Sequence, residues 1–170
     1  MAWTIEEALT CLQSVSLAIA QRDPDLSSDT PQINPGATNS EIDLLEKYWG
    51  IRLPPSYANL LKAANGMTYF WYDNPLLSTQ EIIEDTFETE TFEEPFPKLY
   101  RYIFSCGTED YDAFAFDPSQ VSSDGELSVV ALNDEGEAGR WSSFEVFLKI
   151  YLRWVNASLK DENANLFQNW

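Results

Sequence analysis

The chain has 170 residues, of which 44% are hydrophobic and 14% aromatic, so it can bury a core and is not globally disordered. Its 28 acidic and 10 basic residues give a net charge of -18, which repels nucleic acid and anionic membranes and attracts basic partners. The sequence has no histidine, which excludes Ser-His-Asp and Cys-His catalysis, histidine metal ligation and histidine pH switches.

The length predicts a single domain over residues 1–170, because domains commonly contain roughly 100–200 residues. Cys11 and Cys106 have no metal-ligand spacing, and two cysteines are too few for a disulfide framework. We therefore expect two reduced, buried thiols in a cytoplasmic protein. The sequence shows neither the basic start of a signal peptide nor an apolar run of roughly 18 residues that could span a membrane.

The N-terminal part of the sequence predicts a helix over about 4–21. Thr4 and Glu7 have the spacing of a capping box, and apolar residues follow at steps of three and four from Ile5 to Ile19. Residues 22–40 are rich in proline, serine and aspartate and predict a loop.

Two short helices are expected next. Ser40 with Asp43 resembles a capping box for the first of them, and Gly50 ends it. Pro54 and Pro55 suit the first turn of the second helix, because that turn leaves its backbone N–H groups without partners. Asn65-Gly66 is a stop signal for this helix, since glycine adopts the left-handed conformation without a Cβ penalty.

The remainder of the sequence alternates β-prone segments with turns. Strands are expected over 67–72, 99–104, 112–117 and 127–132, and Ser78 with Glu81 predicts a short helix. Asp73-Asn74-Pro75 and Asp117-Pro118 are read as breaks. A last helix is expected from Ser142 with Glu145, and the tail after 157 is expected to fray. The fold class is therefore α+β: a mostly antiparallel sheet with N-terminal helices and a C-terminal helix packed on it.

The stretch Tyr48-Trp49-Gly50-Ile51-Arg52-Leu53-Pro54-Pro55-Ser56-Tyr57 resembles a motif of the SUKH superfamily, which includes bacterial immunity proteins and fungal regulators of cell-wall synthesis. The resemblance extends over about 40–155, through a Ser-x-x-Glu-Ile element at Ser78 and a Ser-Phe-Glu-x-Phe-Leu helix at Ser143. We interpret the motif residues as determinants of the fold: Gly50, Leu53, Pro54, Tyr57, Leu61, Asn65 and Gly66.

The resemblance implies a non-enzymatic binding protein without a cofactor or metal, most often one that neutralises a bacterial toxin such as a nuclease. An acidic surface with aromatic anchors would suit the basic active site of a nuclease. The alternative that the resemblance leaves open is a regulatory scaffold for signalling or cell-wall-related proteins. Either partner would be a protein, not nucleic acid or a membrane.

The candidate partner-binding residues come from segments that combine carboxylates with aromatic rings. Residues 65–97 contain no lysine or arginine, and an acidic stretch over 86–97 is interleaved with phenylalanine. Aromatic residues dominate binding hot spots, so rings beside this charge are the expected anchors. The expected charges are Glu84, Asp85, Glu88, Glu90, Glu93, Glu94, Glu109, Asp110 and Asp112, and the expected anchors are Trp71, Phe92 and Tyr111.

Carboxylates can also serve glycoside hydrolysis or calcium binding. Glycoside hydrolysis needs two carboxylates at a defined separation in a cleft, and an excess of acidic residues makes chance pairs common. Calcium could use Asp110 with Asp112, or the Asn133–Gly136 turn, but neither segment completes a twelve-residue calcium loop with its terminal glutamate.

Overall fold

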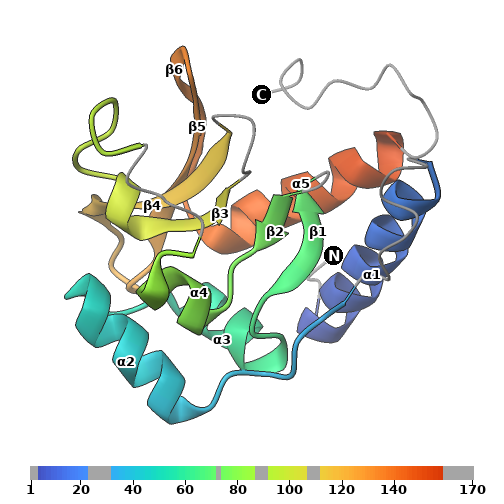
Figure 1. The fold of residues 1–170 in the computed structure, drawn as a ribbon, viewed down its shortest axis with the longest axis horizontal. Helices are drawn as coiled ribbons and strands as arrows, with labels where there is room; N and C mark the ends of the chain where they lie inside the picture. The colour runs from blue at the N-terminus through green and yellow to red at the C-terminus, as the bar shows by residue number, and fades with distance from the viewer. Residues whose placement is uncertain (1–3, 23–31, 72–73, 87–91, 107–111, 159–170) are drawn as a thin grey trace.

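In the part of the chain that the structure describes, six strands form one antiparallel sheet in their order along the chain (Figure 1). The computed structural model describes residues 4–22, 32–71, 74–86, 92–106 and 112–158. The fold is α+β, as the sequence predicts. Its elements are α1 (Ile5–Arg22), α2 (Asn39–Trp49), α3 (Pro55–Ala63), β1 (Met67–Trp71), β2 (Asn74–Leu76), α4 (Thr79–Glu84), the 3₁₀ turn η2 (Tyr100–Tyr102), β3 (Ile103–Cys106), β4 (Ala113–Val121), β5 (Leu127–Asn133), β6 (Gly136–Trp141) and α5 (Phe144–Ser158).

Capping boxes start α1, α2 and α4, because a side-chain oxygen and a glutamate satisfy backbone N–H groups that lack helical partners. The expected boxes form at Thr4 with Glu7 and at Ser78 with Glu81. For α2 the expectation was wrong: Thr38 and Glu41 form the box, and the helix starts before Ser40. The side chain of a glutamate is long enough to accept from the N–H of the capping residue, whereas the side chain of Asp43 is one methylene shorter.

Asn65 and Gly66 follow the end of α3 and also contact the residues that begin α4. The helix ends at Ala63, and the residue that caps it, Ala64, is extended, so Gly66 is not the left-handed cap that was expected. The buried Asn65 side chain accepts from the N–H of Thr79 at 2.8 Å and donates to its Oγ1 at 3.0 Å. Gly66 has a φ of 91°, and a Cβ there would lie 2.8 Å from the Ser78 nitrogen. The pair therefore fixes the start of α4 against the end of α3.

The strand boundaries differ from the sequence expectation in the middle of the sheet. Residues 99–102 form a turn containing η2, so only 103–106 are strand there. Asn74 and Pro75 belong to β2 and are not a turn. β4 continues past Pro118 to Val121, because a register shift between Asp117 and Val121 accommodates a residue without an N–H.

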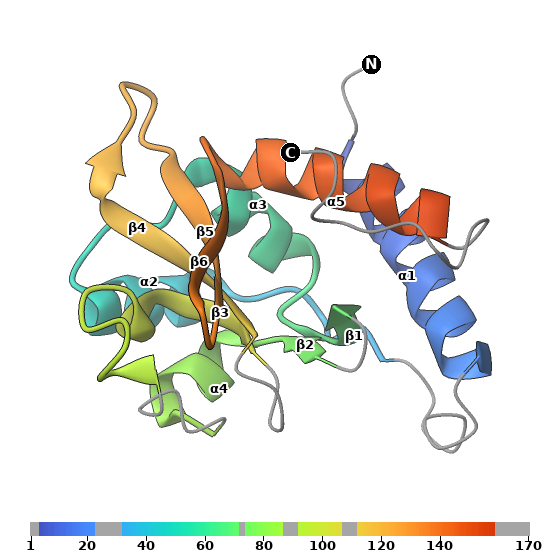
Figure 2. The ribbon, with the colours of Figure 1, turned by 90° about the horizontal axis from the view of Figure 1, so that it is seen from above.

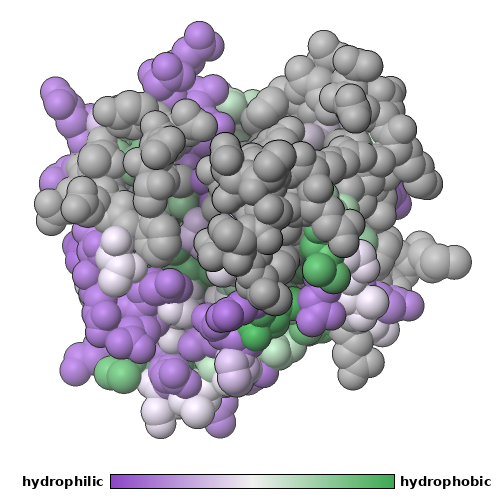
Figure 3. Space-filling view, turned by 45° about the vertical axis from the view of Figure 1, so that its right-hand side comes forward, coloured by the Kyte–Doolittle hydropathy of each residue, from purple (hydrophilic) through white to green (hydrophobic). Residues whose placement is uncertain are grey.

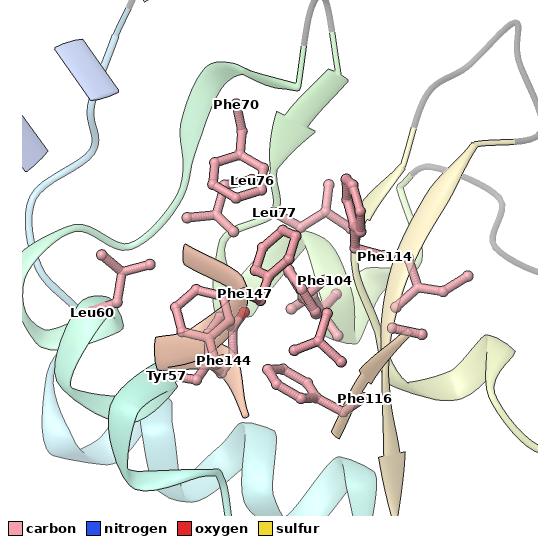
Figure 4. Close-up of a cluster of buried hydrophobic side chains, with 14 of the residues drawn as sticks. Tyr57, Leu60, Phe70, Leu76, Leu77, Phe104, Phe114, Phe116, Phe144 and Phe147 are labelled. Carbon is pink, nitrogen blue, oxygen red and sulfur yellow. The ribbon is translucent and has the colours of Figure 1, made fainter. Parts of the chain in front are cut away.

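Aromatic rings from the sheet and two helices form the centre of the core (Figure 4). Tyr57 of α3 is fully buried and lies between Phe116 at 4.9 Å and Phe144 at 5.1 Å, measured between ring centroids. Phe147 of α5 contacts Phe114 of β4 at 4.9 Å. Ring contacts at 4.5–7 Å add to the hydrophobic gain from burial, so α3 and α5 are held on the same face of the sheet.

Figure 2 shows α3 and α5 on one side of the sheet and α4 on the other. α1 packs against α5, α3 and β1. The free edge of β1 is covered by the segment before α2, where Ile33 bridges Met67 and the Thr68 N–H donates to the Gln32 carbonyl at 3.0 Å.

Candidate functional site

Three hairpin connections of the sheet emerge at the same end. In an antiparallel sheet whose strands follow chain order, alternate connections lie at one end. The pairs that close these hairpins are Trp71 with Asn74, Cys106 with Ala113, and Asn133 with Gly136. The topology therefore places these three connections at one end of the sheet, in the order in which their strands follow one another (Figure 1).

The described residues at this end are rich in carboxylates. Asp112 immediately precedes β4 and is half-buried, while Asp134 and Glu135 are exposed in the turn between β5 and β6. The Asn133 side chain accepts from the Glu135 N–H at 3.0 Å, which fixes this turn. Ala113 pairs with Leu132 on the neighbouring strand, so Asp112 and the acidic turn lie on adjacent connections.

The C-terminus of α4 carries a second group of carboxylates. Burial, together with the charges of Asp85 and Glu81, raises the pKa of the Cys106 thiol to about 12. These carboxylates therefore lie close enough to the end of β3 to act on its last residue. Glu84 is exposed next to Asp85, which takes a left-handed conformation with a φ of 48°. We call Asp112, Asp134 and Glu135, which lie on two connections at this end, the acidic end of the sheet.

The sequence-predicted site residues are divided between this surface and other places. Asp112 lies at the acidic end and Glu84 and Asp85 lie at the C-terminus of α4, whereas Glu93 and Glu94 are exposed in the segment between α4 and η2. The Tyr100 hydroxyl donates to Glu93 at 3.3 Å. Trp71 ends β1, and its side chain is outside the description. Other candidates lie outside the described residues: Glu88, Glu90, Glu109, Asp110 and Tyr111.

Phe92 is not the exposed anchoring ring that was expected in the acidic stretch. Its side chain is only 3% exposed and belongs to the hydrophobic core. It lies 6.4 Å from Phe96, measured between ring centroids, and the Phe92 carbonyl accepts from the Phe96 N–H at 2.9 Å. Phe92 therefore attaches this segment to the core. It does not present apolar surface to a partner.

A hollow in the surface was missed by the sequence analysis. It has a volume of about 670 Å³ and is lined by residues 96–99, 101–102 and 117–119. Lys98 and Arg101 are exposed in its wall. They are the first basic residues after Lys62, and this interruption of a long acidic stretch was the signal that could have identified them.

One carboxylate beside this hollow is held by several donors. The Asp117 carboxylate accepts from Arg140 at 2.7 Å and from the Ser119 hydroxyl at 2.6 Å. Burial alone would raise the pKa of Asp117, but these hydrogen bonds and the Arg140 charge outweigh it and lower the pKa below its usual value. Asp117 is therefore a charged structural group, not a proton donor at neutral pH.

A second, smaller hollow of about 160 Å³ lies between α1, α3 and α5. Its walls are mainly apolar, with Ile5, Leu60 and Leu152 among them, and the ion pair of Lys149 with Glu145 lies at its rim. Within the described ranges, no group of three or more histidine, cysteine, aspartate or glutamate side chains is arranged to hold a metal ion.

Hydrophilic residues cover most of the described surface on the face shown in Figure 3, and hydrophobic residues appear there only in small patches. Among the described helices, none is both long enough and apolar enough to cross a bilayer. The described part of this face therefore offers polar surface more than apolar area for recognition.

Comparison with known proteins identifies one family. A search of curated proteins gave no match. The model of the SMI1/KNR4 family (SUKH-1) matches residues 36–150, from the segment before α2 to the middle of α5. The match includes α2, α3 and the whole sheet, and it excludes α1. Because it covers more than half of the sequence, the chain belongs to the SMI1/KNR4 family (SUKH-1).

Proposed function

We propose that the protein is an immunity protein that neutralises a bacterial toxin by covering a basic surface of it, with a nuclease as the most suitable target. Members of the family are generally non-catalytic binding proteins, which supports a function in recognition. Nuclease active sites are basic because their substrate is a polyanion, and a chain with a net charge of -18 is electrostatically complementary to them.

The observation that carries this proposal is the gathering of carboxylates at the acidic end of the sheet. Asp112, Asp134 and Glu135 come from two hairpin connections that the sheet topology places side by side. Charges fixed on short turns next to paired strands lose little conformational freedom when a partner binds. The acidic end would thus imitate the closely spaced charges of a phosphate backbone.

Co-expression with the product of the neighbouring gene tests the function. We expect that product to be lethal alone and harmless together with this chain. A neighbour that is harmless alone, combined with capture of signalling or cell-wall-related proteins, would contradict immunity and favour the regulatory scaffold.

A charge-reversal pair tests the surface. Asp134→Lys at the acidic end and Asp43→Lys on the exposed side of α2 change the net charge equally. At low salt, we expect Asp134→Lys to weaken toxin binding about tenfold or more and Asp43→Lys to weaken it about threefold or less, because only close charges couple strongly. Equal effects of both substitutions in titration calorimetry would contradict the proposed surface.

A further inference from the structure

The hollow beside η2 has the opposite charge to the rest of the molecule. Its wall carries Lys98 and Arg101, and neither has a carboxylate within ion-pair distance among the described residues. Acidic residues outnumber basic ones 28 to 10, so carboxylates to neutralise these cations are not scarce in the chain. Two unneutralised cations on one hollow form a local positive site on an acidic protein.

The nearby carboxylate does not neutralise this site, because it is already bonded. Asp117 lines the hollow, but its Oδ2 pairs with Arg140 and its Oδ1 accepts from both the N–H and the hydroxyl of Ser119. The Asp117 side chain is only 10% exposed. Lys98 and Arg101 thus keep their donors available for an external group.

The hollow also offers rigid aromatic surface next to these donors. Tyr102 is half-buried and makes an edge contact with the buried ring of Trp49 at 5.9 Å, and Phe96 packs against the core. Both rings line the hollow. Tyrosine and arginine are among the residue types that dominate binding hot spots, because they combine apolar area with donors.

The hollow lies apart from the acidic end. Asp112 immediately precedes β4 at the acidic end, and Asp117 lies further along β4, at the hollow. At the usual rise of a strand these two residues are about 16 Å apart. The two sites are therefore separate surfaces of opposite sign, and one binding group cannot occupy both.

We propose that the hollow formed by residues 96–102 and 117–119 binds an acidic, aromatic-containing peptide segment of a partner protein. The carboxylates of such a segment would accept from Lys98 and Arg101, and its ring would pack on Tyr102 and Phe96. This site goes beyond toxin neutralisation, because it selects a segment whose charge is opposite to that of a nuclease active site.

The test is an amide-shift titration of the ¹⁵N-labelled protein with a capped pentapeptide that alternates glutamate with phenylalanine. At about 150 mM salt, repulsion from charges more than about 8 Å away is largely screened. We expect shifts confined to residues 96–102 and 117–119, and no shifts at these residues with the matching peptide in which lysine replaces glutamate. Shifts centred elsewhere, or no shifts at millimolar peptide, would overturn the proposal.

Paired variants assign the binding to the two cations. Lys98→Glu/Arg101→Glu should weaken peptide binding at least about tenfold, since it replaces two attractions with two repulsions. Lys47→Glu/Lys62→Glu changes the net charge equally at exposed positions on α2 and α3 that do not line the hollow, so binding should change less than about threefold. Equal weakening by both double variants would refute a site at the hollow. The result does not depend on whether a toxin partner exists.

Discussion

Two glycines with positive φ differ in what surrounds them. Gly50 has a φ of 70° and open space where a Cβ would lie, whereas a Cβ on Gly66 would meet backbone atoms of Ser78 and Leu76 at 2.8–3.1 Å. Gly50→Ala should therefore lower the free energy of unfolding by only about 1–2 kcal/mol, the usual cost of a left-handed alanine. Gly66→Ala should cost more, because the Asn65–Thr79 junction must also shift.

Urea denaturation of the two variants compares these costs directly. The midpoint of Gly66→Ala should lie clearly below that of Gly50→Ala, with a similar slope for both. Equal midpoints would show that the start of α4 can move away from Gly66 without lowering the free energy of unfolding.

The Asp117–Arg140 pair predicts a pH-dependent contribution to stability. Hydrogen bonds keep the folded-state pKa of Asp117 below the ordinary value of about 3.9. The contribution of this carboxylate to the free energy of unfolding is therefore complete above about 3.9, and it is lost as the pH falls through the folded-state pKa. At pH 7, Asp117→Asn should be less stable than the wild type by about 1–3 kcal/mol, because Arg140 loses a partner.

Urea denaturation of both proteins between pH 7 and pH 2 measures this linkage. The difference between them should shrink once the pH is below about 4. A difference that stays constant over this range would mean that Asp117 acts through shape alone and not through its charge.

Tyr57 carries a hydroxyl that has no hydrogen-bond partner among the described residues, although its side chain is fully buried. Burial raises the pKa of this phenol well above its ordinary value, so it stays neutral. Tyr57→Phe keeps the ring contacts and removes the unsatisfied group, so the free energy of unfolding should stay the same or rise by about 1 kcal/mol. A fall of more than about 1 kcal/mol in thermal or urea denaturation would show that the hydroxyl is bonded, for example to an internal water.

At the scale of elements, α1 lies outside the matched family region yet belongs to the core. Leu12 is 1% exposed and Leu17 is 49% exposed on the same helix. Leu12→Ala should cost about 2–5 kcal/mol, the usual range for a buried leucine, whereas Leu17→Ala should change stability by less than about 0.5 kcal/mol. Equal effects in urea denaturation would show that α1 does not rest on the core through Leu12.

The helices were predictable because their signals are local. Thr4 with Glu7 and Ser78 with Glu81 specify helix starts within a few residues, and the spacing of Phe144, Phe147 and Tyr151 specifies the buried face of α5. The sequence motif at Gly50 and Tyr57 likewise identified residues that now have structural roles, as a helix end and as the centre of the core.

The strands were less predictable, because pairing decides them. β6 was missed because Gly136-Glu-Ala-Gly-Arg-Trp141 has little intrinsic β-propensity, and it becomes a strand by pairing with β5. The segment Leu99-Tyr-Arg-Tyr102 alternates like a strand but folds as turns, with η2 at its end. For the site, the sequence supplied the acidic residues, but only the topology could show that Asp112 and Asp134 belong to neighbouring connections.

At the scale of the whole molecule, the net charge of -18 opposes the compact state, because folding brings like charges together. Added salt screens this repulsion, so the unfolding temperature should rise between about 10 mM and 300 mM potassium chloride. Thermal scans at pH 7 measure the shift, with an uncharged osmolyte at matched osmolality as the control. A temperature that falls or stays constant with salt would show that local ion pairs outweigh the net repulsion.

The order of the strands has a consequence for how members of this family can diverge. Each hairpin connection at the acidic end joins two strands that are already neighbours, so its length and composition can change without altering strand order or the rings beneath. Mutation can therefore exchange the residues on these connections while the interior is inherited unchanged. Such a fold can acquire new surface residues at this end at little cost to its own folding.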